Sequence, residues 1–325
     1  MSQNIQEPKG QTIPKDDPGS VSKKGSTKFK LAGIAFIPLV VLIIGSYFLV
    51  RPGQVSTIPR TPGDQILVSP QWIQDRLGEI TLLDAARQPG EFAQGHIPTA
   101  AFIPRNLLVT EVNGIAGMLP DPEELERELA EAGVFLDRPV VVYDGANSLW
   151  ASRLFWALEY LGHSQVHLLD GGLAAWQRAG FELSTQTQIP ERGDFVARVQ
   201  PQLLADSVYV LERLSTENSF IIDARSPQEF SGENAQAARG GHIPGSQNIN
   251  WTEHLGEEGV LLPISVLAQL YQDVITNTDH EAITLCQTGI RGAHTYLVLR
   301  VLGMENVRLY DGSWAEWGNN PDLPL

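Results

Sequence analysis

Short apolar runs alternate with amphipathic stretches throughout residues 66–325. An unbroken apolar run such as residues 139–143 is typical of a strand buried on both faces. Asp121 predicts the start of a helix, because it can cap the first turn and Pro122 suits the first helical position. Strands that alternate with helices indicate an α/β fold, in which helices cover a parallel sheet and ligands bind at the carboxyl ends of the strands. Further helices are predicted over residues 150–161, 263–274 and 292–302.

The same pattern occurs twice along the chain. Four landmarks of the first repeat recur in the same order in the second, at offsets of 139, 146, 142 and 141 residues. A repeat of this length, in a chain of 325 residues, predicts two similar domains. We place them at residues 66–183 and 203–325, joined by an irregular linker over 184–202. The paired landmarks are Asp84 and Asp223, His96 and His242, Asp144 and Cys286, and Asp170 and Asp311.

A different pattern precedes the first repeat. Residues 31–50 carry no charge, and at about 1.5 Å per residue they span a hydrocarbon layer of roughly 30 Å. We therefore expect one transmembrane helix over 31–50, after a disordered tail over 1–30 and before a linker over 51–65. A cleaved signal peptide fits less well, because no cleavage site of small residues follows the apolar stretch.

Charge gives this anchor a direction and excludes one class of ligand. Lysines cluster before the apolar stretch and only Arg51 follows it, which predicts a cytoplasmic N-terminus and periplasmic or lumenal repeats. Residues 1–51 hold seven basic and three acidic residues, so they carry +4 of the net charge of −15 and leave −19 for residues 52–325. Such an acidic part argues against binding of nucleic acid. The lysines are Lys23, Lys24, Lys28 and Lys30.

The sequence gives no reason to expect a cofactor or a metal. No glycine-rich phosphate loop follows a predicted strand. Of the seven histidines, His163 and His167 are four residues apart, but they straddle a predicted helix end and strand, so a zinc site is not expected. His96 and His242, which recur in the repeat, are expected to hold a turn by hydrogen bonds.

The chain has a single cysteine, Cys286, whose default interpretation is an inert buried thiol. Its position argues otherwise, because it follows a predicted strand and precedes a predicted helix, with Gly289 free to take a positive φ. The N–H groups of such a turn point inward, the helix start adds partial positive charge, and Arg291 adds a full charge. A thiol in this place should be largely ionised and act as a nucleophile. The other loop residues predicted to line the substrate are Gln287, Thr288, Gly289 and Ile290.

These motifs resemble those of the tandem-domain rhodaneses, over roughly residues 66–320. The second repeat is similar to their catalytic domain in Asp-Ala-Arg at 223–225, Gly-His-Ile-Pro-Gly-Ser at 241–246, the Cys-x-x-Gly-x-Arg loop and Tyr-Asp-Gly-Ser-Trp at 310–314. The first repeat resembles their non-catalytic domain. The resemblance implies that Cys286 takes the outer sulfur of thiosulfate, releases sulfite, and passes the sulfur from a persulfide to cyanide or a thiol.

The resemblance also suggests roles for neighbouring side chains. Arg291 is the best candidate for binding the substrate anion, and Arg239 is a second one, with a solvated surface charge as its alternative. Pro244 stands where animal thiosulfate sulfurtransferases have an Arg, and Gln287-Thr288 matches neither the thiosulfate loop nor the mercaptopyruvate loop, which leaves the donor open. Four residues are expected to support the site structurally: Asp223, Arg225, His242 and Asp311.

Asp144 takes the place of the cysteine in the first repeat, and no Arg follows it in the loop. A carboxylate cannot attack a sulfane sulfur and would repel thiosulfate, so this domain is expected to be inactive and to form one wall of a cleft between the domains. Two alternatives to the sulfurtransferase stay open. One is a non-catalytic binding or scaffold module at the membrane. The other is a cysteine phosphatase or arsenate reductase, although those need five residues between Cys and Arg, where four stand here.

Overall fold

The structure is a computed structural model that describes residues 58–325. The tail predicted over 1–30, the transmembrane helix predicted over 31–50 and the first part of the predicted linker lie outside the described residues. Within residues 58–325, no helix combines the length and the apolar character needed to cross a membrane.

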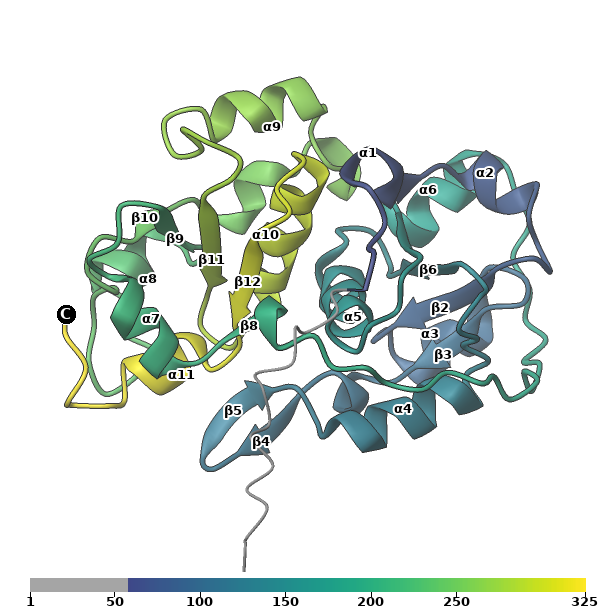
Figure 1. The fold of residues 1–325 in the computed structure, drawn as a ribbon. Helices are drawn as coiled ribbons and strands as arrows, with labels where there is room; N and C mark the ends of the chain where they lie inside the picture. Colours follow the sequence, from purple (N-terminus) through teal and green to yellow (C-terminus); the bar gives the residue numbers. More distant parts are fainter. Residues whose placement is uncertain (1–57) are drawn as a thin grey trace, which may run out of the picture. The chain divides into compact units, whose positions relative to one another are not determined.

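Two five-stranded parallel sheets form the framework, which confirms the predicted α/β fold with two domains (Figure 1). The strand order is the same in both, β3-β2-β6-β7-β1 in the first domain and β10-β9-β11-β12-β8 in the second. The first sheet contains β1 (Leu67–Val68), β2 (Thr81–Ala85), β3 (Ala101–Ile103), β6 (Val140–Tyr143) and β7 (Val166–Leu169). The second contains β8 (Leu204–Ala205), β9 (Ser219–Asp223), β10 (Gln247–Asn248), β11 (Glu281–Leu285) and β12 (Val307–Tyr310).

Helices cover both sheets, and the first domain adds an antiparallel hairpin of β4 (Thr110–Val112) and β5 (Ile115–Met118). The helices of the first domain are α1 (Gly63–Ile66), α2 (Pro70–Gln74), α3 (Pro89–Gln94), η1 (Arg105–Leu107), α4 (Pro122–Glu131), α5 (Leu149–Tyr160) and α6 (Gly172–Arg178). Those of the second are η2 (Pro201–Leu203), α7 (Ser207–Arg213), α8 (Pro227–Ser231), η3 (Trp251–His254), η4 (Glu257–Gly259), α9 (Ile264–Leu270), α10 (Ile290–Val301) and α11 (Ser313–Trp317).

Helix ends follow local chemistry where a cap is present. Asp121 caps α4, because its carboxylate accepts a hydrogen bond from the Glu123 N–H, as predicted. The helix predicted from residue 292 begins earlier, at Ile290, since Gly289 before it has φ +80° and serves as its N-cap. The helix predicted over 263–274 ends already at Leu270.

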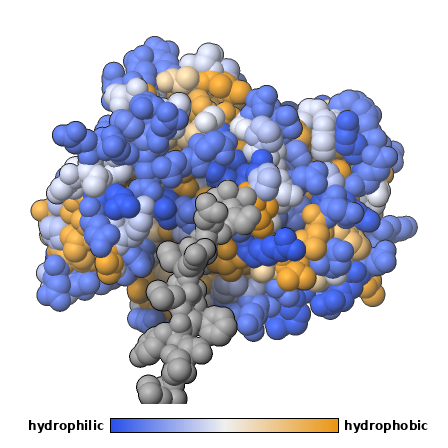
Figure 2. All heavy atoms as spheres, in the orientation of Figure 1, coloured by the Kyte–Doolittle hydropathy of each residue, from blue (hydrophilic) through white to orange (hydrophobic). Residues whose placement is uncertain are grey.

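The two domains share a core. Helices α5 and α10 pack against each other between the sheets, and both contribute to one cluster of buried apolar residues (Figure 1). Every residue from Gly292 to Val301 and from Ala151 to Glu159 is buried. A helix buried all round needs neighbours on all sides, so each domain completes the packing of the other's central helix. By contrast, the face of the molecule drawn in Figure 2 is largely hydrophilic, with smaller apolar areas between the polar ones.

The described part of the predicted N-terminal linker, residues 58–65, is packed against the domains. Residues 63–66 form α1, and the carbonyl of Thr61 accepts a 2.9 Å hydrogen bond from Arg300. Arg300 is buried and also pairs with buried Glu159 of the first domain at 3.3 Å. Since buried charges need several partners, the segment is held where the two domains meet.

Candidate active site

The Cys286 loop, residues 286–289, follows the central strand β11 and leads into α10. Every residue of β11 is buried, all five pair with β9, and the three middle ones also pair with β12, so the loop begins at the carboxyl end of the sheet's middle. The Cys286 side chain is only 1% exposed. Gln287, Thr288, Ile290 and Arg291 around it are partly exposed, and together they form a rim above the thiol.

Ser313 holds the loop at both ends. Its hydroxyl accepts hydrogen bonds of 3.1 Å from the N–H groups of Cys286 and Gly289, and it donates one of 2.8 Å to the Tyr310 carbonyl. Ser313 is fully buried and has φ +48°, a conformation that costs energy for any residue but glycine. The sequence analysis did not single out Ser313. The signal was present, because Gly172 occupies the matching place in the first repeat.

Arg291 is paired with Glu229 of α8, through two hydrogen bonds of 2.8 Å. Burial alone would raise the pKa of Glu229, but hydrogen bonds from Arg291 and Ser226 and the charge of Arg291 lower it to about 2. Burial would lower the pKa of Arg291, yet Glu229 and the nearby Cys286 side chain raise it above its ordinary value. Arg291 thus brings the predicted full charge to the vicinity of the thiol, but within an ion pair with Glu229. Sequence analysis missed Glu229, which lies 62 residues away.

Two other predicted contact residues bind backbone groups. The Arg239 guanidinium donates to the carbonyls of residues 317, 318, 320 and 323, at 2.5 to 3.4 Å. These contacts tie down the C-terminal segment and fit neither predicted alternative for Arg239, an anion contact or a solvated charge. The amide of Gln287 donates to the Gln236 carbonyl at 3.1 Å.

The supporting residues form the same arrangement in both domains. Asp223 and Arg225 make a buried, bidentate ion pair with N···O distances of 2.6 to 3.0 Å. The His242 ring stacks on Phe230 at 3.9 Å and its Nδ1 lies 3.0 Å from the Phe230 carbonyl oxygen. In the first domain Asp84 pairs with Arg87 in the same way, and His96 stacks on Phe92. An arrangement that occurs beside both loops supports the fold of each domain and does not distinguish the one with the cysteine.

In the first domain, the Asp144 side chain fills its own loop. One carboxylate oxygen accepts hydrogen bonds from the N–H groups of Ala146 and Ser148, at 3.1 Å each, and the other from Trp150 at 3.0 Å and Ala151 at 3.3 Å. Burial raises the pKa of Asp144, and these four bonds oppose the rise. The loop shape thus directs several backbone N–H groups at one buried anion.

Each domain contributes a segment that binds an aspartate of the other domain, directly after the strand next to the central one. The N–H of Leu119, after the hairpin, donates to Asp311 of the second domain at 2.8 Å. Reciprocally, the N–H of Leu261 donates to Asp170 of the first domain at 3.0 Å. Figure 1 shows the β4–β5 hairpin extending toward α11 of the second domain.

The comparisons with known proteins agree with this geometry. A family model for the rhodanese-like domain matches the chain twice, over residues 69–179 and 207–320. The chain belongs to the rhodanese family. A thiosulfate sulfurtransferase from Azotobacter vinelandii is 36% identical over 262 residues, which cover 80% of this chain and 96% of the relative. A 3-mercaptopyruvate sulfurtransferase from Escherichia coli K12 is 35% identical over 273 residues, which cover 79% and 96%.

A solved structure of the same fold also matches this rhodanese. SseA from Escherichia coli, a protein of the rhodanese fold, is 33% identical and matches with a TM-score of 0.69 over 77% of this chain and 99% of SseA. The relatives share sulfur transfer as their reaction, so the prediction of a sulfurtransferase is confirmed. The relatives are named for different sulfur donors, thiosulfate in one case and 3-mercaptopyruvate in the other.

The rhodanese also contains a buried histidine pair, which the sequence analysis missed. Nδ1 of His254 lies 3.3 Å from Nδ1 of His294, and Nε2 of His254 lies 2.8 Å from the Tyr271 hydroxyl. Burial lowers the pKa of His294 to about 4, and burial lowers that of His254 as well, so both rings are neutral. The two histidines are 40 residues apart in the sequence, so no short sequence motif reveals that they are neighbours. Within the described residues, no three potential ligands gather for a metal.

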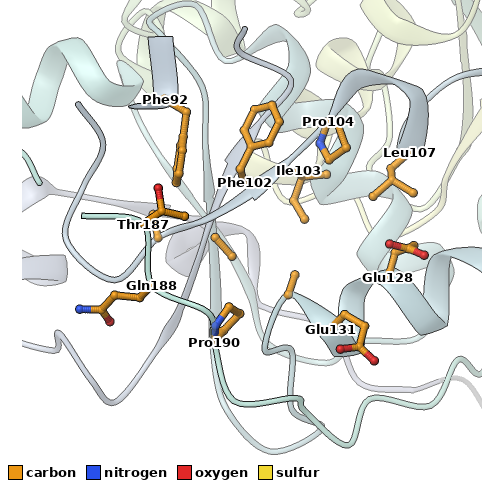
Figure 3. A pocket seen from close by; sticks show the side chains of 13 residues that line it. Phe92, Phe102, Ile103, Pro104, Leu107, Glu128, Glu131, Thr187, Gln188 and Pro190 are labelled. Atoms are coloured by element: carbon orange, nitrogen blue, oxygen red, sulfur yellow. The ribbon is translucent and has the colours of Figure 1, made fainter. Parts of the chain in front are cut away.

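A cavity of about 310 Å³ lies in the first domain, apart from the Cys286 loop. Figure 3 shows Phe92 and Phe102 on one side of it, with Gln188 and Pro190 of the predicted interdomain linker on the other. None of its lining residues belongs to the second domain's loop. Its position gives it no part in the chemistry of Cys286.

Proposed function

We propose that this rhodanese moves a sulfur atom from thiosulfate, or a related donor such as 3-mercaptopyruvate, to cyanide or a thiol through a persulfide on Cys286. The main support for the proposal is the way in which the Asp144 loop binds its own carboxylate. There, a loop of the same position and connection directs four N–H groups at an anion. The second domain offers a thiol at that position, and a thiolate or persulfide is the anion that such a loop favours.

The proposed reaction has two steps. The Cys286 thiolate attacks the outer sulfur of thiosulfate, the S–S bond of the donor breaks, and sulfite leaves with the bonding electron pair. The acceptor, cyanide or a thiolate, then attacks the outer sulfur of the persulfide and the Cys286 thiolate returns. N–H groups of the loop and of the first turn of α10 stabilise the negative charge in both steps, with the Arg291 and Glu229 pair at the rim.

Thiosulfate is the first donor to test. The relatives named for thiosulfate and for 3-mercaptopyruvate match this chain at 36% and 35% identity, so identity does not select between them. On the rim, Gln287 and Thr288 are neutral and Arg291 is already paired. We expect a rim of this kind to bind a small divalent anion weakly and to rely on the loop N–H groups for rate.

The test is thiocyanate formation by the full-length chain, with each donor in turn and cyanide as acceptor. We expect turnover with thiosulfate, and loss of that turnover in Cys286→Ser. Asp144→Ser is the matched control, since it makes the same kind of change at the equivalent position of the other domain. The proposal fails if the wild-type chain, with its thiol free and reduced, forms no thiocyanate from either donor. That result would favour the non-catalytic binding or scaffold module.

We also propose that residues 31–50 anchor the protein in a membrane, with the N-terminus in the cytoplasm and both domains outside, in the periplasm or a lumen. The support is the uncharged apolar stretch and the lysines before it. Protease added to intact spheroplasts should digest both domains. If they are digested only after lysis, the proposed orientation is wrong.

A further inference from the structure

The Cys286 loop is held from the side by a buried ion pair between the domains. Arg153, on α5 of the inactive domain, donates from Nη1 to Oδ1 of Asp311 at 2.5 Å. Arg153 is fully buried and the Asp311 side chain is 3% exposed. The other oxygen of Asp311 accepts the N–H of Leu119 at 2.8 Å. Asp311 of the second domain is therefore held by two groups of the first domain.

This ion pair touches the loop at Gly289. A Cβ on Gly289 would lie 2.5 Å from Oδ1 of Asp311 and 3.1 Å from Nη1 of Arg153. Gly289 is also one of the two residues whose N–H binds Ser313, and it caps α10. A shift of the ion pair would therefore move the residue that sets the loop's direction.

Arg153 also holds the β4–β5 hairpin on the loop. Its Nη2 donates to the Gly117 carbonyl at 3.0 Å, and its Nε donates to the Leu108 carbonyl at 3.1 Å. Gly117 has φ +88°, and a Cβ there would lie 2.5 Å from Cβ of Thr288 and 2.7 Å from its carbonyl oxygen. Only glycine allows this approach, so the hairpin lies in close contact with Thr288, two residues from the thiol.

The opposite side of the interface lacks such a charge. Counted from the start of each helix, Arg153 on α5 corresponds to His294 on α10. Burial lowers the pKa of His294 to about 4, and the nearby backbone of Asn147 in the Asp144 loop opposes this shift. A neutral ring thus faces the loop without a cysteine, and a charged guanidinium faces the loop with one.

We infer that Arg153 of the inactive domain is a positioning residue for Cys286: with Asp311 it fixes the loop at Gly289 and clamps the hairpin over Thr288, so that the first domain determines access to the thiol. The inference rests on the proposed function for its consequence in sulfur transfer. The position of the thiol itself does not depend on that function.

The experiment compares three variants of the full-length chain with the wild type. Arg153→Met with Asp311→Asn removes both charges together and avoids leaving one of them buried alone. Gly117→Ala pushes the hairpin away from Thr288 and leaves the ion pair in place, and it serves if the double variant does not fold. Glu159→Gln is the matched control. It weakens a different buried ion pair between the domains, that of Glu159 near the end of α5 with Arg300 near the end of α10, where Arg300 keeps Glu305 as a partner at 2.7 Å.

Two readouts are taken for each folded variant: the rate at which iodoacetamide alkylates the single cysteine, and kcat and KM for thiosulfate. The double variant and Gly117→Ala should speed alkylation about tenfold, because a thiol that is 1% exposed becomes accessible when the clamp loosens. They should lower kcat/KM by about 10- to 100-fold through displacement of the loop. Glu159→Gln should leave both values within about twofold, even where its melting temperature falls.

The outcomes separate the inference from the proposed function. If alkylation accelerates in the clamp variants alone while the wild type transfers no sulfur, the positioning role stands and the proposed function fails. If the wild type transfers sulfur and the clamp variants match Glu159→Gln in both readouts, Arg153 is only a structural residue and the inference is wrong.

Discussion

The loops at Asp144 and Cys286 occupy equivalent positions in their domains, but a different side chain stands at the start of each and different contacts hold each loop. Each follows the middle strand of a parallel sheet, and each is followed by a buried helix preceded by a left-handed residue, Ser148 at φ +59° or Gly289 at φ +80°. The first loop is filled by its own carboxylate. The second is braced from outside by the Ser313 hydroxyl, where the first domain has Gly172.

This difference separates what the fold supplies from what individual residues supply. In the first domain, inward N–H groups of the loop stabilise the Asp144 carboxylate. We propose that the second loop does the same for sulfur, so that the residue at the strand end decides between an inert carboxylate and a nucleophilic thiolate. Bracing by Ser313 and by Arg153 leaves the loop's interior to the thiol, whereas the Asp144 side chain occupies it.

The largest expected effect comes from placing the first loop's residue in the second. Cys286→Asp should lower thiocyanate formation by roughly 10⁴-fold or more, because it removes the nucleophile. The free energy of unfolding should change little, since the new carboxylate can accept hydrogen bonds from N–H groups of its loop, as the Asp144 carboxylate does in the first domain. Steady-state assays and urea unfolding measure the two quantities.

The reverse exchange is the control. Asp144→Cys in the Cys286→Asp background should restore no activity, because no Arg follows in that loop and Trp150 stands at the corresponding place. Thiocyanate formed by this double variant would mean that loop shape and a thiol suffice, and the comparison between the loops would have to be abandoned.

The next effect is on stability. Asp144→Ala deprives four buried N–H groups of their acceptor, so we expect the free energy of unfolding to fall by about 2 to 4 kcal/mol, with water replacing part of the loss. Activity per folded molecule should stay within about twofold of the wild type. Asp144→Asn, which keeps one acceptor oxygen, should lose less stability. A fall in activity as large as that of Cys286→Ser would contradict the inactive role of this domain.

Ser313 should give a smaller effect. Ser313→Ala removes the acceptor of two loop N–H groups, and we expect a loss of about 1 to 2 kcal/mol in stability and about tenfold in kcat/KM. Ser313→Gly makes the second loop resemble the first and also relieves the positive φ. It should therefore be the more stable of the two variants and equally slow. Equal rates for wild type and both variants would show that the hydroxyl does not brace the loop.

The smallest effect concerns pH. The pKa of Glu229 is lowered from 4.5 to about 2 in the folded protein, so its pair with Arg291 stabilises the fold fully above pH 4.5, and this contribution is lost as the pH falls toward 2. Arg291 is 22% exposed, so we expect about 1 kcal/mol. The difference in unfolding free energy between wild type and Glu229→Gln should be constant above pH 4.5 and shrink progressively as the pH falls from 4.5 toward 2. A difference that grows as the pH falls would contradict this assignment.

Local features of the site could be predicted from the sequence. The end of β11, the positive φ of Gly289 and the Asp121 cap follow from apolar runs, glycine and capping chemistry within a few residues. The partners of the site could not. Glu229 lies 62 residues from Arg291, and Arg153 lies 158 residues from Asp311, so only the packing of strands and domains brings each pair together.

The most direct test of the central claim is the intact mass of the full-length chain after brief treatment with thiosulfate and removal of the excess. We predict that the chain gains the mass of one sulfur atom, carried by the peptide that contains Cys286, and that cyanide removes this mass and releases thiocyanate. Cys286→Asp should gain nothing. A reduced wild-type chain whose mass stays unchanged with thiosulfate and with 3-mercaptopyruvate, or an added sulfur that cyanide cannot remove, would contradict a persulfide on Cys286.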